Sequence, residues 1–201
     1  MVGSADLVTL FVAIANSDHD AAAHLLNSAP GLATAGIARP DEFFLSARFA
    51  QVYEGDTALH AAAFSYDTEM ARELMASGAD PRARNRRGAE PLHAAVIGNP
   101  GSPTWNPARQ YEVIHYLIDS GADPNAPAAG GVTPLHRAVR NRCSAAVEVL
   151  LRAGADPRRQ NDNGSTASDL ALCTTGRGGT GSAVAKAEQQ TIMELIRVNT
   201  W

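Results

Sequence analysis

Three histidines recur in similar local surroundings and are the first side chains to consider for chemistry: His60, His93 and His136. Imidazole nitrogen is a common zinc ligand, so a repeated histidine raises the question of a metal site. If each histidine belongs to its own structural unit, the three lie too far apart to share one ion at Zn–N distances of about 2 Å. We therefore predict no metal and no catalytic histidine.

A glycine-rich segment, residues 176–181, matches the G-x-G-x-x-G pattern of dinucleotide-binding turns. That turn requires a preceding strand, whereas this segment follows an apolar helical run, so we predict no nucleotide cofactor. Its backbone N–H groups and Arg177 would suit an anion, because the loop leads into a predicted helix. The alternative is a flexible linker.

Cys143 lies beside Arg140 and Arg142, and nearby positive charge lowers the pKa of a thiol. No histidine is adjacent in sequence to act as its base, so we expect no catalytic residue here. Two cysteines, Cys143 and Cys173, are too few for a disulfide scaffold. Enzymatic activity stays open, although the pattern disfavours it.

The elements that hold these residues form a repeat. Three segments align with one another, at residues 55–62, 88–95 and 131–138, and each is followed by an apolar helical run and then by Gly-Ala-Asp-Pro. Thr57 and Thr133 suit a helix cap, and Pro91 and Pro134 suit a first helical turn. Both the motif and its spacing resemble the ankyrin repeat, whose T-P-L-H-x-A pattern recurs about every 33 residues.

The resemblance extends to both ends of the chain and implies an all-α solenoid of about five helix-turn-helix repeats, with hairpin loops and three insertions. It also implies that the recurring histidine is structural and hydrogen-bonds between repeats. We predict a single domain over residues 1–201. Its parts are a capping repeat 1–30, an insertion 31–54, full repeats 55–87, 88–130 and 131–163, and a capping repeat 164–201, with a second helix over 183–198.

The first insertion contains three of the five phenylalanines, including Phe43 and Phe44. Pro40 with two acids behind it predicts a helix start. One interpretation is a plug over the apolar edge of the first repeat; the other is a partner-binding aromatic patch.

The other two insertions lie between the two helices of a repeat, over residues 98–109 and 174–182. In the ankyrin fold such loops share one edge, so these two would flank the turn 140–144. We predict an anion-binding site there, favouring phosphate or carboxylate. The alternatives are solvated turn arginines and a tryptophan that packs back on the solenoid. The predicted site comprises Trp105, Asn106, Arg140, Arg142, Cys143, Thr174, Thr175, Arg177, Gly178 and Gly179.

Four arginines crowd the hairpin after the first full repeat, and Arg158 and Arg159 occupy the matching place two repeats on. They suit an acidic protein partner or are simply solvated. The four arginines of the first of these hairpins form, with Phe43 and Phe44, a predicted secondary partner surface. The four arginines are Arg82, Arg84, Arg86 and Arg87.

The formal net charge of −4 gives no general attraction for nucleic acid. We reject a signal peptide because no basic residue precedes Arg39, and no apolar run is long enough for a membrane span. We expect a cytoplasmic, monomeric, cofactor-free scaffold that binds a protein partner. The alternative function is a small-anion binder, or an atypical enzyme, that uses the edge site.

Overall fold

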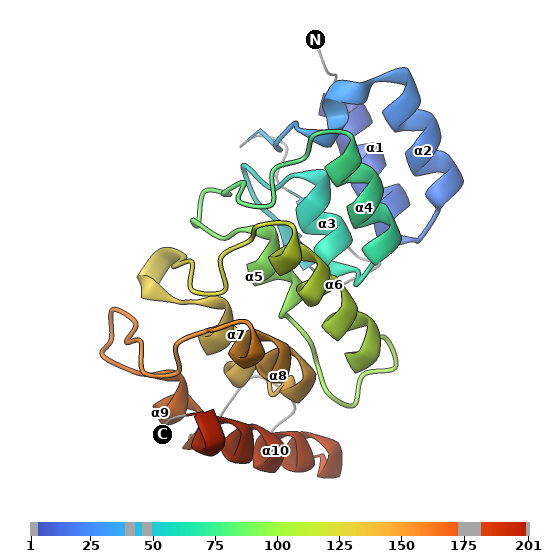
Figure 1. The fold of residues 1–201 in the computed structure, drawn as a ribbon. Helices are drawn as coiled ribbons and strands as arrows, with labels where there is room; N and C mark the ends of the chain where they lie inside the picture. Colours follow the sequence, from blue (N-terminus) through green and yellow to red (C-terminus); the bar gives the residue numbers. More distant parts are fainter. Residues whose placement is uncertain (1–3, 39–42, 46–49, 173–181, 200–201) are drawn as a thin grey trace. The chain divides into compact units, whose positions relative to one another are not determined.

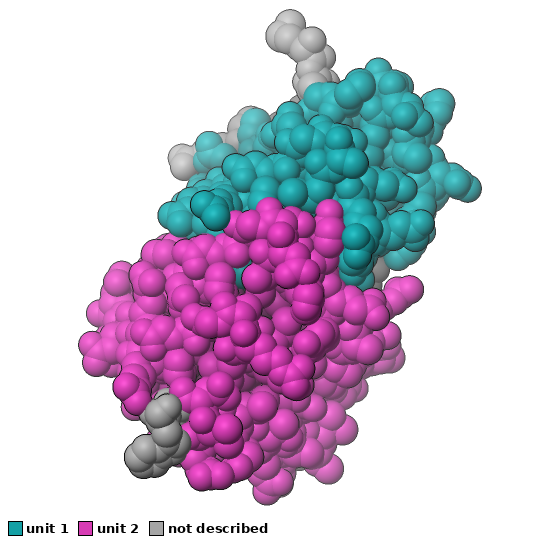
Figure 2. All heavy atoms as spheres, in the orientation of Figure 1, with its two compact units in different colours: residues 1–95 teal, residues 96–201 magenta. Residues whose placement is uncertain are grey.

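The structure is a computed structural model that describes residues 4–38, 43–45, 50–172 and 182–199. These residues form paired antiparallel helices joined by extended loops (Figure 1). The chain separates into two compact units, residues 1–95 and 96–201 (Figure 2). Each unit is described by itself below.

Unit 1 contains five α-helices among its described residues. They are α1 (Ser4–Ala15), α2 (His19–Ser28), α3 (Ala58–Phe64), α4 (Thr68–Ala76) and α5 (Pro91–Ala95), with a 3-10 turn at Pro30–Ala33. Helix α3 packs against α1, α4 and α5, so it is the centre of this unit. Ala61, Ala62 and Ala63 are all buried in α3, and small side chains there allow neighbouring helices to approach closely.

Two described segments of the first insertion form a two-stranded antiparallel sheet, between α2 and α3 in the chain. Strands β1 (Phe43–Leu45) and β2 (Ala50–Val52) pair antiparallel, with Phe43 opposite Val52. The prediction that a helix starts at Pro40 is wrong for residues Phe43–Leu45, which form a strand. Pro40 itself lies outside the described residues. The alternation along β1 explains the strand, since Leu45 is buried while Phe44 is exposed.

Unit 2 contains the other helices described. They are α6 (Pro107–Asp119), α7 (Pro134–Arg140), α8 (Ser144–Arg152), α9 (Ala167–Leu172) and α10 (Ala183–Asn199), with a 3-10 turn at Ala129–Gly131. Helix α8 packs against α6, α7 and α10, while α9 packs against α7 and α10. The helix predicted over 183–198 is confirmed. The insertion predicted over residues 98–109 is a loop only as far as Asn106, because Pro107 suits a first helical turn and α6 begins there.

No helix in the described ranges has both the length and the apolarity to cross a membrane.

Candidate functional site

The recurring threonine–histidine pair builds the start of α3 and of α7. His60 Nδ1 accepts from the Thr57 backbone N–H at 3.1 Å, and its Nε2 lies 3.1 Å from the Ala89 carbonyl oxygen 29 residues further on. His136 repeats the arrangement, with its Nε2 3.0 Å from the Ser165 oxygen. These bonds tie two of the repeats to the one that follows and confirm the structural role implied for His60 and His136.

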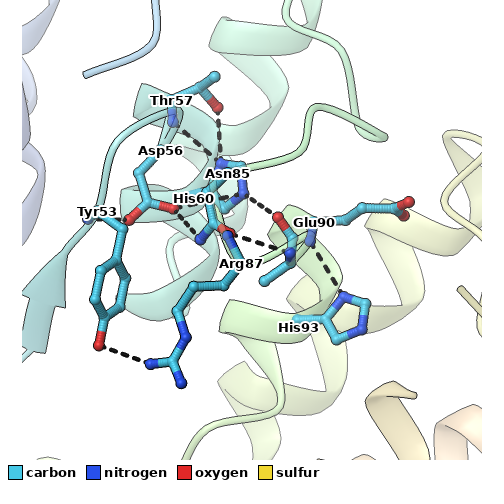
Figure 3. Close-up of polar contacts among 9 residues, drawn as sticks. Tyr53, Asp56, Thr57, His60, Asn85, Arg87, Glu90 and His93 are labelled. Atoms are coloured by element: carbon cyan, nitrogen blue, oxygen red, sulfur yellow. Dashed lines mark hydrogen bonds and ion pairs between the residues drawn. The ribbon is translucent and has the colours of Figure 1, made fainter. Parts of the chain in front are cut away.

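A buried amide and carboxylate join two successive hairpins of unit 1 (Figure 3). Asp56 accepts the Asn85 Nδ2 donor at 2.8 Å and the Tyr53 backbone N–H at 2.7 Å. Asn85 Oδ1 in turn accepts the backbone N–H groups of Arg87 at 2.9 Å and Ala89 at 3.1 Å. Because Asp56 and Asn85 are both buried, these bonds are shielded from water and hold the hairpin backbone firmly.

Two arginines of this hairpin stack on one tyrosine ring. The guanidinium carbons of Arg86 and Arg87 each lie 5.1 Å from the ring centroid of Tyr53. Arg87 Nη1 also donates to the Tyr53 hydroxyl at 3.0 Å, a contact visible in Figure 3. The Arg86 backbone N–H donates to the Glu54 carbonyl at 2.7 Å. Cation–π contact limits how freely both exposed side chains move, so their remaining donors are presented in defined positions.

Arg84 is engaged differently, because it pairs with a carboxylate at the start of α5. Its Nε and Nη2 lie 3.0 and 2.9 Å from Glu90 Oε1. Glu90 replaces the threonine of the other repeats and is 3% exposed, whereas the Arg84 side chain is half exposed. A buried carboxylate is costly unless a positive charge pairs with it, so the Arg84 guanidinium stabilises the fold by pairing with Glu90.

The predicted edge site in unit 2 is closely packed where the structure describes it. Trp105 Nε1 donates to Oε1 of the buried Gln110 at 3.1 Å. A Cβ added at Gly98 would lie 2.6 Å from Cys143 Sγ and 2.8 Å from two Trp105 ring atoms. Trp105 therefore folds back onto the helices, and only glycine leaves it room.

The thiol of Cys143 is fully enclosed in this packing. Burial raises the pKa of Cys143 to about 12, and the nearby Glu188 carboxylate also raises it. A thiol with such a pKa is almost entirely protonated at neutral pH, so it is not a ready nucleophile. The adjacent arginines do not offset this burial.

The two arginines of the turn before α8 have different surroundings. Arg140 is exposed, whereas Arg142 is 4% exposed and has a left-handed backbone with φ 58°. Asn106 accepts the Arg109 backbone N–H at 3.1 Å and so caps α6. Arg142 is therefore buried and Asn106 serves as a helix cap. Of the three residues, Arg140 is the one whose side chain is exposed and caps no helix.

Comparison with known families decides which kind of repeat this is. A family model described as ankyrin repeats (3 copies) matches residues 10–128, and a second, ankyrin repeats (many copies), matches residues 117–171. The chain belongs to the ankyrin-repeat family. Ankyrin repeats are generally protein-interaction modules. No curated protein matches the chain.

The ankyrin architecture brings together only part of the predicted edge site. Trp105 and Cys143 lie in one packed cluster, with Gly98 and Gln110 completing it. The other wall of the predicted site lies outside the described residues, so the anion site stays a prediction. Those residues are Thr174, Thr175, Arg177, Gly178 and Gly179.

The predicted secondary surface is divided between exposed and packed residues. Phe44 is 56% exposed, whereas Phe43 contacts Phe11 edge-to-face at a centroid distance of 6.2 Å. Phe43 thus packs on the first repeat and Phe44 is exposed, so the plug and the partner-binding patch both stay predictions. Sequence reasoning missed Tyr53 and Glu90, which organise the arginines; the replacement of threonine by Glu90 within the motif was the available signal.

Proposed function

We propose that this ankyrin chain binds a protein partner through the hairpin arginine surface of unit 1, which we define as Tyr53, Arg82, Arg84, Arg86 and Arg87. The observation that carries the proposal is the stacking of Arg86 and Arg87 on Tyr53. A guanidinium held against a ring loses little side-chain entropy on binding, which favours recognition. Arginine and tyrosine are also the side chains that most often dominate protein interfaces.

The chemistry of this surface favours a partner segment rich in carboxylates. Guanidinium groups bind carboxylates through two parallel hydrogen bonds. The whole chain carries a formal charge of −4, so an acidic partner would be drawn to this local positive patch and not to the molecule in general. Binding of this kind weakens as ionic strength rises.

A matched pair of variants tests the proposal. The double variant Arg86→Ala/Arg87→Ala removes both stacked charges, and Arg158→Ala/Arg159→Ala removes two exposed arginines from the equivalent hairpin of unit 2. Proteins captured from lysate by the wild-type chain should be lost with the first variant and retained with the second. Direct titration of each captured partner should show at least about a tenfold loss, as expected for truncated hot-spot residues.

The variant Arg86→Lys/Arg87→Lys separates charge from geometry. Lysine keeps the positive charge but lacks the planar fork, so we expect it to restore only part of the affinity. Equal binding by the wild type and the Arg86→Ala/Arg87→Ala variant would contradict the proposal. Arg84 is left unchanged, because its guanidinium compensates the buried Glu90 carboxylate.

A further inference from the structure

The two hairpins that form the hairpin arginine surface touch at the level of their backbones. Gly55 has a φ of 84°, and a Cβ added there would lie 2.8 Å from Asn85 Cα and 3.0 Å from the Arg84 carbonyl oxygen. Only glycine therefore allows the hairpin that carries Tyr53 to approach the hairpin that carries Arg87 so closely. This close approach fixes the position of the tyrosine ring beneath the arginines.

Arg87 and Tyr53 form a pair of hydrogen-bond donors at the surface. Arg87 Nη1 donates to the Tyr53 hydroxyl oxygen at 3.0 Å (Figure 3). Because that oxygen accepts the bond, its own O–H points elsewhere and can donate to a ligand. Arg87 is exposed and Tyr53 is half-buried, and within the described part of the chain no carboxylate pairs with the Arg87 guanidinium. A ligand at this point therefore meets N–H and O–H donors from two hairpins.

The carboxylates near this pair are few and mostly turned inward. Residues 82–87 contain four arginines and no acidic residue. Asp56 is buried and accepts the Asn85 side chain, while the buried Glu90 binds Arg84. Glu54 follows Tyr53 in the chain and is half-buried. Donors therefore dominate the exposed side of the surface, which suits an anion.

A phosphate monoester matches this arrangement better than a single carboxylate does. A carboxylate has one charge and two oxygens, which the fork of one guanidinium satisfies. A phosphorylated side chain has a charge of about −1.5 to −2 at pH 7 and three acceptor oxygens. It can accept from the Arg87 fork and from the Tyr53 hydroxyl together. Its additional charge is attracted to Arg86, which lies against the same ring.

We propose that the hairpin arginine surface recognises a phosphorylated serine or threonine in the partner segment, with Arg87 and Tyr53 as the contacting residues. This inference rests on the proposed function, because it names the group that the same surface binds. The phosphate takes the place of one carboxylate in the acidic segment. Phosphorylation of the partner therefore strengthens the complex, and removal of the phosphate weakens it.

Three synthetic peptides test which anion the surface prefers. They share one sequence of glycine, alanine and aspartate and differ at a central position, which is serine, glutamate or phosphoserine. Chemical-shift titration of the isotope-labelled full chain, at one fixed ionic strength, measures each Kd even where binding is weak. We expect the phosphoserine peptide to bind at least about tenfold more tightly than the glutamate peptide, as added charge-assisted hydrogen bonds predict. Equal or tighter binding of the glutamate peptide overturns the proposal, as does a phosphoserine peptide that causes no shifts.

The variant Tyr53→Phe isolates the contribution of the hydroxyl. It keeps a ring for Arg86 and Arg87 but removes the O–H donor, so the preference for phosphoserine over glutamate should fall at least about threefold. Tyr111→Phe is the matched control, because the Tyr111 hydroxyl accepts from Arg152 Nη1 at 3.3 Å in unit 2, outside the surface. Circular dichroism verifies that both variants keep their helix content. A preference that Tyr53→Phe leaves unchanged contradicts the assigned contact.

Phosphatase treatment separates this inference from the proposed function. Proteins that the wild-type chain captures, and that Arg86→Ala/Arg87→Ala does not, are dephosphorylated and titrated again. A loss of at least about tenfold in affinity supports the phosphate contact. Unchanged affinity overturns it and leaves the proposed function standing. Capture that Arg86→Ala/Arg87→Ala does not reduce overturns both.

Discussion

His19 joins the first two repeats of unit 1 through contacts with two carboxylates, one of which caps a helix. Its Nε2 lies 2.7 Å from Asp67 Oδ2, and its Nδ1 lies 3.5 Å from Glu69 Oε2. Asp67 uses its other oxygen to accept the Met70 backbone N–H at the start of α4. The hydrogen bond that His19 donates to Asp67 raises the pKa of His19; burial opposes the rise, and the charges of Asp67, Glu69 and Glu73 add to it.

This shift makes the stability of unit 1 depend on pH. Because the folded-state pKa of His19 is raised, its stabilisation is fully present below the unfolded pKa of about 6.5 and is lost as pH rises through the folded value. We expect His19→Gln to cost less than about 1 kcal/mol at pH 6, since solvent screens this partly exposed pair, and less again at pH 8.

Urea unfolding of wild type and His19→Gln at both pH values measures this difference. His24→Gln, which changes an exposed histidine of the same helix, is the control. A cost for His19→Gln that is the same at pH 6 and pH 8 would show that the protonated imidazole contributes nothing.

At the scale of elements, the second helix of each repeat begins at a cap, and one of these caps comes from another helix. Asp18, Asp67 and Asn106 cap α2, α4 and α6 from their own N-cap positions. Helix α8 has Cys143 at that position, without a side-chain cap bond. Instead Glu188 of α10 accepts the Ser144 backbone N–H at 2.8 Å. The carboxylate also faces the positive end of the α8 dipole.

We expect Glu188→Ala to destabilise unit 2 by about 1 kcal/mol, the usual loss on removing a helix cap. Glu188→Gln should lose less, because the amide oxygen still accepts the hydrogen bond while the charge is gone. Chemical denaturation measures both. Glu194→Ala, on the same helix but paired with the exposed Arg197, should change stability less. A larger loss for Glu194→Ala than for Glu188→Ala would refute the assigned cap.

At the scale of the whole molecule, each compact unit has a central helix and others with fewer neighbours. Helix α3 has α1, α4 and α5 around it, whereas α2 packs on α1 and the 3-10 turn Pro30–Ala33. Repeat proteins are stabilised by nearest-neighbour contacts, so regions with fewer neighbours open more readily.

We therefore expect amides of α2 to exchange with solvent faster than those of α3, by at least about tenfold after correction for intrinsic rates. Hydrogen exchange followed by mass spectrometry resolves the two helices. Equal protection in both would indicate that unit 1 opens only as one cooperative block, contrary to this expectation.

The amino-acid sequence predicted those features that depend on residues close together in the chain. The repeat motif, the helix starts at Pro91 and Pro134, and the helix over 183–198 all follow from caps, prolines and apolar periodicity. The loop before α6 follows from its prolines and glycines in the same way. Family membership follows too, because the motif carries the structural Thr57–His60 and Thr133–His136 pairs within four residues.

Only the tertiary structure decided features that join residues distant in the chain. The segment Phe43–Leu45 is a strand because it pairs with Ala50–Val52 and packs on Phe11, although Pro40 and its neighbouring acids suggested a helix. Arg142 is buried while Arg140 is exposed. Their spacing alone could not distinguish them, because burial depends on which elements fold over a side chain. Tyr53 likewise became a platform for Arg86 and Arg87 only when two hairpins were brought together, more than thirty residues apart.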